Sequence, residues 1–186
     1  MQVTQIVDWQ SMGNVMTVRT LLIAALAAVG AAGVPMIAAA EPARPATRAD
    51  AASDAANQAV VESLYRAFGA GDGATIAGLL DPGLIWIEAE HGPYADRNPY
   101  NGPGAVFEGL FARIGAEYEG FAVTPVTYLV SGDRVVALGR YTGTNRATGE
   151  ALDAQFAHVF TVSSGKVTRF QQYTDTAQWM DVVTPD

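Results

Sequence analysis

The stretch WIEAEHGPY, residues 86–94, brings two glutamates, one of the two histidines of the chain and a tyrosine close together in sequence. Carboxylates and imidazoles can act as general acids and bases when burial moves their pKa values toward neutrality. The stretch opens with the alternating polarity of a β-strand, in which successive side chains point to opposite faces of the sheet. It is therefore either an acid/base site or a strand that ends in a polar loop.

Alternation places aromatic side chains and isolated polar groups together on one face of each of three predicted strands. These groups are Trp86, Glu88 and Glu90 in the first strand, Phe156, His158 and Phe160 in the second, and Thr168, Phe170 and Gln172 in the third. Such a mixture is typical of the wall of a ligand cavity inside a curved sheet. Periodicity equally allows Ile85 and Ile87 to be the buried face of the first strand, which would leave both glutamates in solvent.

Three polar residues each fit a simpler structural role. His158 lies between two phenylalanines and is either a catalytic imidazole or a hydrogen-bonded core residue. Arg140, in LGRYTG, is either the partner of a buried carboxylate or a surface arginine, and surface positions are the rule for this residue type. His91 belongs to the loop that leaves the first strand, and we interpret it as a solvated residue.

Composition limits the classes of function that the chain can have. The 186 residues are 49% hydrophobic and 16% charged, which fits one globular domain with an appendage. The net charge is −8, and the sequence contains no cluster of lysine and arginine residues. A nucleic-acid partner is therefore excluded, since phosphate contacts need a basic face. The chain has no cysteine and two histidines without ligand spacing, and we expect neither a metal nor another cofactor.

The first forty residues have the layout of a secretory signal peptide. An uncharged apolar run, 21–40, follows Arg19 and ends in three alanines, so we expect cleavage after Ala40 and export to the periplasm or beyond the cell. After cleavage no membrane contact is expected, although the run is just long enough to serve instead as an uncleaved anchor. Residues 1–15 contain an aspartate and no basic residue, which favours Met16 as the true start.

The predicted elements follow the order of an α+β fold. A Pro/Ala-rich linker at 41–53 leads to helices at 54–69 and 72–80, a strand at 84–90, a helix from Pro103 and four strands between 121 and 175. Either Ser53 or Asp54 can cap the first helix. Helices that precede an antiparallel meander predict three N-terminal helices packed against a curved, mainly antiparallel sheet, in one domain at 54–183.

Four segments together resemble a known family. They are the helix end YRAFGAGD, the turn and strand DPGLIWIEAE, the helix entry YNGPGAV and the closing hairpin FAHVFTVSSGKVTRFQQYTD, which span about residues 57–178. Their order and spacing resemble the SnoaL-like, or ketosteroid-isomerase-like, branch of the nuclear-transport-factor-2-like superfamily. The resemblance implies a cone-shaped α+β barrel around an apolar pocket, and a homodimer that packs through the outer face of the sheet.

The resemblance also implies roles for individual residues. Glu88 falls where ketosteroid isomerases carry their proton-shuttling aspartate, which favours the inward orientation of Trp86 and Glu88. His158 falls near the position of the protonated aspartate of those enzymes. Gln172 stands where SnoaL-type cyclases and limonene-type epoxide hydrolases carry a catalytic aspartate, and a glutamine cannot take up that proton. The oxyanion-binding tyrosine of the isomerases would fall nearer Leu64 than Tyr65, so this donor is not expected.

These expectations define an enzyme hypothesis and two alternatives. In the enzyme, Glu88 moves a proton on a small, mostly apolar molecule, and His158 with Tyr94 or Tyr100 from the covering loop stabilises the developing oxyanion. The remaining predicted ligand contacts are Trp86, Phe156, Phe170 and Gln172. The same pocket without turnover would make a carrier of a small lipophilic ligand. A dimeric interaction module would need only the outer face of the sheet.

Overall fold

The computed structural model describes residues 47–184. The predicted signal peptide or anchor, the alternative start at Met16 and the linker as far as residue 46 lie outside the described residues. Within the described part, no helix combines the length and the apolar character needed to cross a membrane.

The first helix, α1 (Arg48–Gly69), begins six residues before its predicted start. Its N-cap is Thr47, whose side-chain oxygen accepts from the Asp50 amide at 3.2 Å, while the Asp50 carboxylate accepts from the Thr47 amide at 2.8 Å. The prediction of a flexible linker through residue 53 is therefore wrong from residue 48 onward. The stretch ADAASDAA has no apolar periodicity, but alanine stabilises a helix without any packed face.

Two further helical segments follow α1 and pack beside the first strand. Helix α2 (Gly73–Leu79) is capped by Asp72, which accepts from the Thr75 amide at 3.0 Å. The predicted third helix is a run of α3 (Gly102–Val106), a π-helical turn η3 (Phe107–Phe111) and α4 (Ala112–Glu117). A short 3₁₀ turn, Ala95–Arg97, lies in the loop before it.

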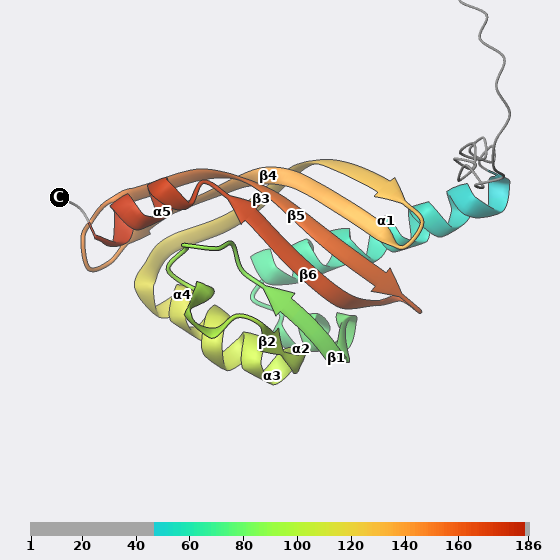
Figure 1. The fold of residues 1–186 in the computed structure, drawn as a ribbon, viewed down its shortest axis with the longest axis horizontal. Coiled ribbons are helices and arrows are strands. Elements are labelled where there is room, and N and C mark those ends of the chain that lie inside the picture. Colours follow the sequence, from blue (N-terminus) through green and yellow to red (C-terminus); the bar gives the residue numbers. More distant parts are fainter. Residues whose placement is uncertain (1–46, 185–186) are drawn as a thin grey trace, which may run out of the picture. The chain divides into compact units, whose positions relative to one another are not determined.

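The sheet has six strands in the order β2-β1-β6-β5-β4-β3. The strands are β1 (Leu80–Ile87), β2 (Tyr100–Asn101), β3 (Tyr118–Ser131), β4 (Arg134–Asn145), β5 (Ala151–Ser163) and β6 (Lys166–Thr174). Only β1 and β6 pair in parallel, whereas the other neighbours are antiparallel. Figure 1 shows α1 to α4 on one side of this curved, unclosed sheet, which confirms the α+β prediction.

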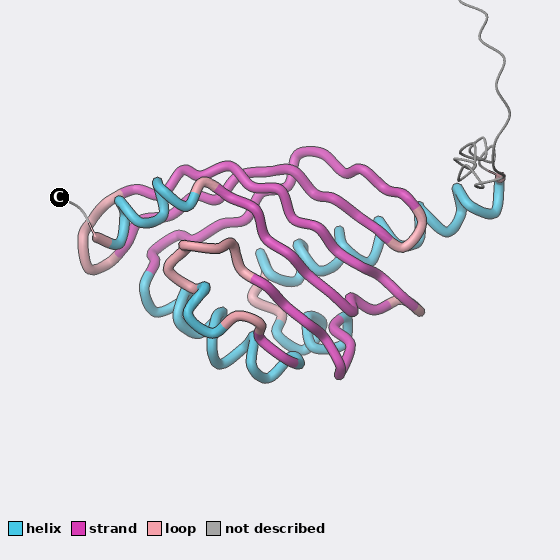
Figure 2. The backbone as a smooth tube through the Cα atoms, in the orientation of Figure 1, coloured by secondary structure: helices cyan, strands magenta, loops and turns pink. Residues whose placement is uncertain are grey.

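A C-terminal helix, α5 (Thr176–Val183), was not predicted. Asp175 caps it by accepting from the Gln178 amide at 3.2 Å. Its buried residues, Trp179 and Val182, close the end of the sheet where β4 and β5 meet, and Figure 2 shows the helix beside that end. The helix is anchored to the sheet connection because the Thr148 hydroxyl donates to the Val182 carbonyl at 2.8 Å.

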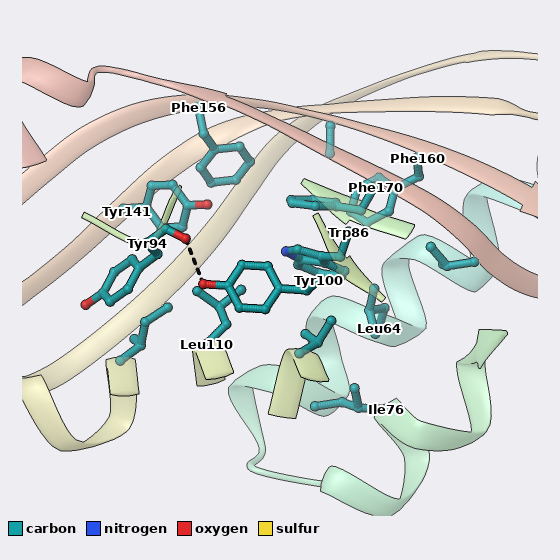
Figure 3. Close-up of a cluster of buried hydrophobic side chains, with 14 of the residues drawn as sticks. Leu64, Ile76, Trp86, Tyr94, Tyr100, Leu110, Tyr141, Phe156, Phe160 and Phe170 are labelled. Carbon is teal, nitrogen blue, oxygen red and sulfur yellow. Dashed lines mark hydrogen bonds between the residues drawn. The ribbon is translucent and has the colours of Figure 1, made fainter. Parts of the chain in front are cut away.

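The buried side chains lie between the helices and the inner face of the sheet (Figure 3). At one point of this face Gly139 of β4 lies directly opposite Phe156 of β5. A β-carbon on Gly139 would collide with the Phe156 ring and the Thr124 carbonyl, and it would lie 2.8 Å from Pro125 Cα. The Phe156 ring therefore occupies space that only a glycine leaves open.

We expect Gly139→Ala to lower the free energy of unfolding by about 1–3 kcal/mol, because a filled core must shift to admit the methyl group. Chemical denaturation of the two proteins measures the difference. Gly115→Ala is the matched control, since no atom lies within 4 Å of its new β-carbon and alanine suits a helix better than glycine. Equal stability of the Gly139 variant and the unmodified protein would show that the Phe156 ring is not confined there.

Candidate functional site

A cavity of about 60 Å³ lies between the inner face of the sheet and the helices. Five of its lining residues carry a hydroxyl, carboxyl, imidazole or amide group, namely Tyr65, Glu88, Tyr141, His158 and Gln172. The rest of the lining is apolar or aromatic and comes from α1, β1, the segment 102–117, β3, β5, β6 and α5. The sheet thus supplies most of the polar wall, and the helices supply most of the apolar wall.

Glu88 is buried at the end of β1, with 4% of its surface exposed. Its carboxylate accepts from the Trp86 indole nitrogen at 2.6 Å. Because β1 ends at Ile87, the Asn98 side chain replaces the missing strand partner: its oxygen accepts from the Glu88 amide at 2.9 Å, and its nitrogen donates to the Glu88 carbonyl at 2.8 Å. Hydrogen bonds therefore hold both the backbone and the side-chain carboxylate of Glu88 in place.

Burial raises the pKa of Glu88 to about 7, although the Trp86 and Gln172 side chains favour the charged form. A carboxyl group with this pKa can both release and take up a proton near neutral pH. Unpaired carboxylates normally titrate well below this range, so the position of Glu88 gives it the property that a general acid or base needs.

The raised pKa of Glu88 predicts a specific dependence of stability on pH. The folded protein, with a pKa of about 7 at Glu88, holds this proton more tightly than the unfolded chain, with a value of 4.5. The stabilisation is therefore complete below pH 4.5 and is lost as the pH rises through 7, by up to about 3 kcal/mol. His158, whose pKa is lowered to about 3, has the opposite effect on the pH dependence of stability. This effect is present both in the unmodified protein and in the variant Glu88→Gln, so it cancels when the two are compared.

The measurement is the free energy of unfolding of the unmodified protein minus that of Glu88→Gln, followed from pH 5 to pH 8. We expect this difference to decline steadily with rising pH, because only the glutamate has a proton to lose in that range. A difference that stays level across the range would mean that Glu88 is already ionised at pH 5.

His158 of β5 is buried and bonded through both ring nitrogens to tyrosine hydroxyls. Its Nδ1 lies 2.8 Å from the Tyr65 hydroxyl, and its Nε2 lies 2.5 Å from the Tyr141 hydroxyl. Burial lowers the pKa of His158 to about 3, so the ring is neutral, and one nitrogen donates while the other accepts. The Phe156 ring stacks on the imidazole, with centroids 3.9 Å apart.

Gln172 of β6 lies opposite His158 in the sheet and extends this chain of hydrogen bonds. Its oxygen accepts from the Ala89 amide at 3.1 Å, which orients the side chain so that its nitrogen donates to the Tyr141 hydroxyl at 2.7 Å. The glutamine therefore connects the residue after Glu88 with the two tyrosines and the imidazole. It acts here as a fixed donor, a role that an ionised aspartate could not fill.

The structure brings five of the predicted site residues together at the cavity: Trp86, Glu88, His158, Phe170 and Gln172. The Trp86 and Phe170 rings stack with centroids 3.7 Å apart, which confirms the inward orientation of this face of β1. Glu90 and His91 are exposed and do not line the cavity. Arg140 is also exposed, and its guanidinium pairs with Asp153 rather than with a buried carboxylate.

Three of the predicted ligand contacts, Tyr94, Tyr100 and Phe156, do not line this cavity. The Tyr94 hydroxyl donates to the Glu117 carboxylate at 2.7 Å. The Tyr100 hydroxyl donates to the Tyr94 carbonyl at 2.7 Å, a bond drawn in Figure 3. Both hydroxyls thus hold the loop and the helical segment in place. Phe156 lies behind His158 and supports the imidazole.

The sequence interpretation missed several residues of the cavity wall, among them Tyr65, Tyr141 and Trp179. No tyrosine donor was expected from the first helix, but both Leu64 and Tyr65 reach the cavity. Tyr65 belongs to the apolar stripe of that helix, so its inward direction was visible in the spacing. Tyr141 could have been found by the same alternation along β4, whereas Trp179 could not, because its helix was not predicted.

The fold and this cavity define the class of protein. The sequence pattern of the SnoaL-like domain matches residues 61–170, and the chain belongs to this family. No curated protein matches the chain. Among solved structures, a protein of the nuclear-transport-factor-2-like fold from Burkholderia thailandensis is 31% identical, with a TM-score of 0.65, and the alignment covers 70% of this chain and 98% of that one.

Two other solved structures are similar in fold. TerC, crystallised with polyporic acid, is 25% identical, with a TM-score of 0.62 and coverage of 69% of this chain and 98% of that one. A proposed SnoaL-like polyketide cyclase from Jannaschia sp. is 20% identical, with a TM-score of 0.63 and coverage of 72% and 95%. The SnoaL-like domain match and the likeness to the Burkholderia thailandensis protein confirm the sequence-based assignment to the SnoaL-like branch of the nuclear-transport-factor-2-like superfamily, and the structural likenesses confirm its cone-shaped fold.

Proposed function

We propose that this SnoaL-like domain is an enzyme that moves a proton on a small, largely apolar carbonyl compound, in a reaction of the isomerase, cyclase or lyase type. One observation carries the proposal: a buried carboxyl group with a pKa of about 7 shares a single cavity with a chain of tyrosine and imidazole groups. A proton next to a carbonyl becomes acidic only if the charge that develops on the oxygen is stabilised. The site offers both a base and a donor.

The roles follow from the contacts. Glu88, fixed by Trp86 and Asn98, is the base that removes the proton and returns it at a neighbouring atom. The Tyr65 hydroxyl, held by His158, is the donor to the carbonyl oxygen. A neutral hydroxyl is suited to this task because burial raises the pKa of Tyr65 far above its ordinary value, which keeps its proton in place until the oxygen becomes basic.

The cavity volume indicates how a substrate enters. Ligand pockets commonly enclose about 300–1,000 Å³, whereas this cavity measures about 60 Å³. A substrate of ordinary size therefore displaces side chains of the apolar wall, among them Phe111 of the π-helical turn and Trp179 of α5. Rotation of interface side chains on binding is common in proteins whose backbone scarcely moves.

The test is proton exchange, because it requires no knowledge of the product. Small enolisable ketones are incubated with the protein in deuterated water, and the loss of their α-proton signals is followed by NMR. We expect exchange of at least one apolar ketone to be faster with the protein than without it. If such ketones bind but none exchanges, the site is that of a non-catalytic carrier.

The carrier is the second candidate, and one observation favours it. Glutamine stands at position 172, where related cyclases use an acid, and its amide is already committed to Ala89 and Tyr141. TerC, whose structure was solved with polyporic acid, supports small-molecule binding as the coarser function. The cavity at Glu88 and His158 supports either pocket function over a module that acts only through its outer face.

We also propose that the outer face of the sheet binds a second copy of this chain. Four large apolar side chains are exposed on β3, β4 and β6, namely Val126, Leu129, Leu138 and Tyr173, and Val126 is 73% exposed. Leu138 and Tyr173 flank Ala157 across neighbouring strands, so an apolar row crosses the sheet. Resemblance to the superfamily implies that a second copy covers this face.

We expect the protein to sediment as a dimer and Leu138→Glu to sediment as a monomer with unchanged far-ultraviolet circular dichroism, because burying an unpaired carboxylate at an interface is unfavourable. Ala59→Glu, at an exposed position of α1, is the control for added charge, because α1 lies on the other side of the sheet (Figure 1). Sedimentation of the unmodified protein as a monomer at tens of micromolar would contradict the proposal.

We retain the proposal that the chain is exported after cleavage at Ala40, with the membrane anchor at 21–40 as its alternative. The support is the composition of that apolar run and of the basic leader from Met16. N-terminal sequencing of the mature protein distinguishes the two.

A further inference from the structure

The hydrogen bonds of Tyr65, His158 and Tyr141 leave one proton unused. The two hydroxyls and the neutral imidazole hold three protons between them, whereas two hydrogen bonds join them. Each bond uses one proton, because a hydrogen bond needs one donor and one acceptor. One hydroxyl proton is therefore always free for another acceptor.

The tautomer of His158 decides which tyrosine holds the free proton. With the imidazole proton on Nδ1, the ring donates to Tyr65 and accepts from Tyr141, so the Tyr65 proton is free. With the proton on Nε2, both bonds reverse, and the Tyr141 proton is free. Both tyrosines line the cavity, so the free donor faces the same cavity from two different places. The Gln172 nitrogen donates to the Tyr141 oxygen in both states.

We propose that Tyr65, His158 and Tyr141 conduct a proton along the cavity wall, and that the ligand is a small conjugated molecule with two oxygen functions, a carbonyl facing Tyr65 and a hydroxyl facing Tyr141. This inference rests on the proposed function and deepens it, because it names the substrate class and makes Tyr141 a second contact to the ligand. The two hydroxyl oxygens are separated by an imidazole ring and two hydrogen bonds, so the two oxygens of the ligand lie at opposite ends of its skeleton.

Four protons each move by one place in the transfer. The ligand hydroxyl gives its proton to the Tyr141 oxygen, and the proton of Tyr141 moves to Nε2 of His158. The Nδ1 proton moves to the Tyr65 oxygen, and the proton of Tyr65 moves to the ligand carbonyl oxygen. The former hydroxyl becomes a carbonyl, the former carbonyl becomes a hydroxyl, and the double bonds between them shift. After release, a water molecule accepts a proton from Tyr141 and gives one to Tyr65, while the earlier Tyr65 proton returns to Nδ1 and the Nε2 proton returns to Tyr141. A cavity of this volume has room for about two waters.

The burial of the chain favours a concerted transfer. Burial raises the pKa of both tyrosines well above the ordinary range and lowers that of His158 to about 3. A tyrosinate or an imidazolium is therefore costly here, whereas the concerted movement leaves all three side chains neutral before and after the transfer.

The tautomers can be measured without any ligand by ¹⁵N NMR of histidine-labelled protein. His91, the other histidine, is exposed, and the variant His91→Gln leaves only the His158 signals. We expect both ring nitrogens to resonate between the positions of a protonated and an unprotonated nitrogen, because the two tautomers exchange. One fully protonated and one bare nitrogen would show a fixed tautomer and would overturn the relay.

The ligand class is tested with 4-nitrophenol, which carries oxygen functions at both ends of a ring, and with 4-nitroanisole, whose methyl ether has no proton to donate. We expect Tyr141→Phe and Tyr65→Phe each to weaken 4-nitrophenol binding by about tenfold, in line with one lost hydrogen bond. Binding of the ether should weaken less than twofold, because the remaining tyrosine supplies the free proton. Circular dichroism confirms that the variants are folded.

Equal losses for the two probes, or no binding of 4-nitrophenol to the unmodified protein up to its solubility limit, would overturn the two-oxygen proposal. This failure is distinguishable from failure of the proposed function. If proton exchange depends on Glu88 but the two probes bind alike, Glu88 is still the base of the proposed function. Only the relay proposal is then refuted.

Discussion

Replacement of Glu88 by glutamine should lower the rate of proton exchange of a bound ketone by about 100- to 10,000-fold, the usual contribution of a positioned general base. Glutamine keeps the size of the side chain and can still accept from the Trp86 indole, but it cannot take up a proton. The loss should therefore fall on kcat, whereas KM should change little. The measurement is the initial rate of deuterium incorporation at saturating ketone.

Glu90→Gln is the matched control, since it removes a carboxylate two residues further along that is exposed and does not line the cavity. We expect it to retain the full rate. A Glu88→Gln protein that exchanges protons at the rate of the unmodified protein would show that another group is the base, because Glu88 is the only carboxylate among the described residues that line the cavity.

Replacement of Tyr65 by phenylalanine should lower kcat by about 100- to 1,000-fold, as the loss of one oxyanion donor does in other enzymes. The ring that packs against Phe156 and Phe160 would remain, and only the hydroxyl would be lost. The donor acts when charge develops on the oxygen, so the effect should again fall on kcat. Steady-state kinetics with the same ketone measures it.

Tyr128→Phe controls for the loss of a nearby hydroxyl. The Tyr128 ring lies 6.3 Å from that of Tyr65, but it does not line the cavity, so we expect kcat within twofold of the unmodified protein. A Tyr65→Phe protein with unchanged kcat and a raised KM would mean that the hydroxyl binds the ground state only and is not the oxyanion donor.

The sequence predicted which strand side chains point toward the cavity, because side chains alternate between the two faces of a strand. Trp86, Glu88, His158, Phe170 and Gln172 all face the cavity, as their spacing and the resemblance to the family indicated. Alternation alone could not choose between the two faces of β1, because both carry large apolar side chains. The resemblance of residues 57–178 to a known family favoured one of the two faces.

Two predicted ligand contacts, Tyr94 and Tyr100, lie outside the cavity wall, and their positions depend on contacts between distant segments. Tyr94 and Tyr100 were assigned to the ligand because a loop near the strand end could cover the cavity. Their hydroxyls instead bond to Glu117 and to the Tyr94 carbonyl, and no local pattern specifies these partners. Trp179 was missed for a related reason, since α5 is short and its stability depends on packing against the sheet rather than on its own sequence.

Two predictions about the first helix differ from the structure, each for a different reason. The early start of α1 was missed because an alanine-rich segment was interpreted as flexible, although alanine favours a helix. Tyr65 was rejected as the donor because the comparison of positions pointed nearer to Leu64. Both residues reach the cavity, since neighbouring positions on one helix can flank the same space.

The proposed chemistry requires Glu88 to be a buried carboxyl group able to exchange its proton near neutral pH. ¹³C NMR of glutamate-labelled protein tests this requirement, and the Glu88 carboxyl signal is identified by its absence from Glu88→Gln. We expect this signal to titrate with a midpoint near the pKa of about 7 that follows from burial. A midpoint at the ordinary value of 4.5 would contradict this expectation, because a carboxylate that is fully ionised at neutral pH would be too weak a base for the proposed reaction.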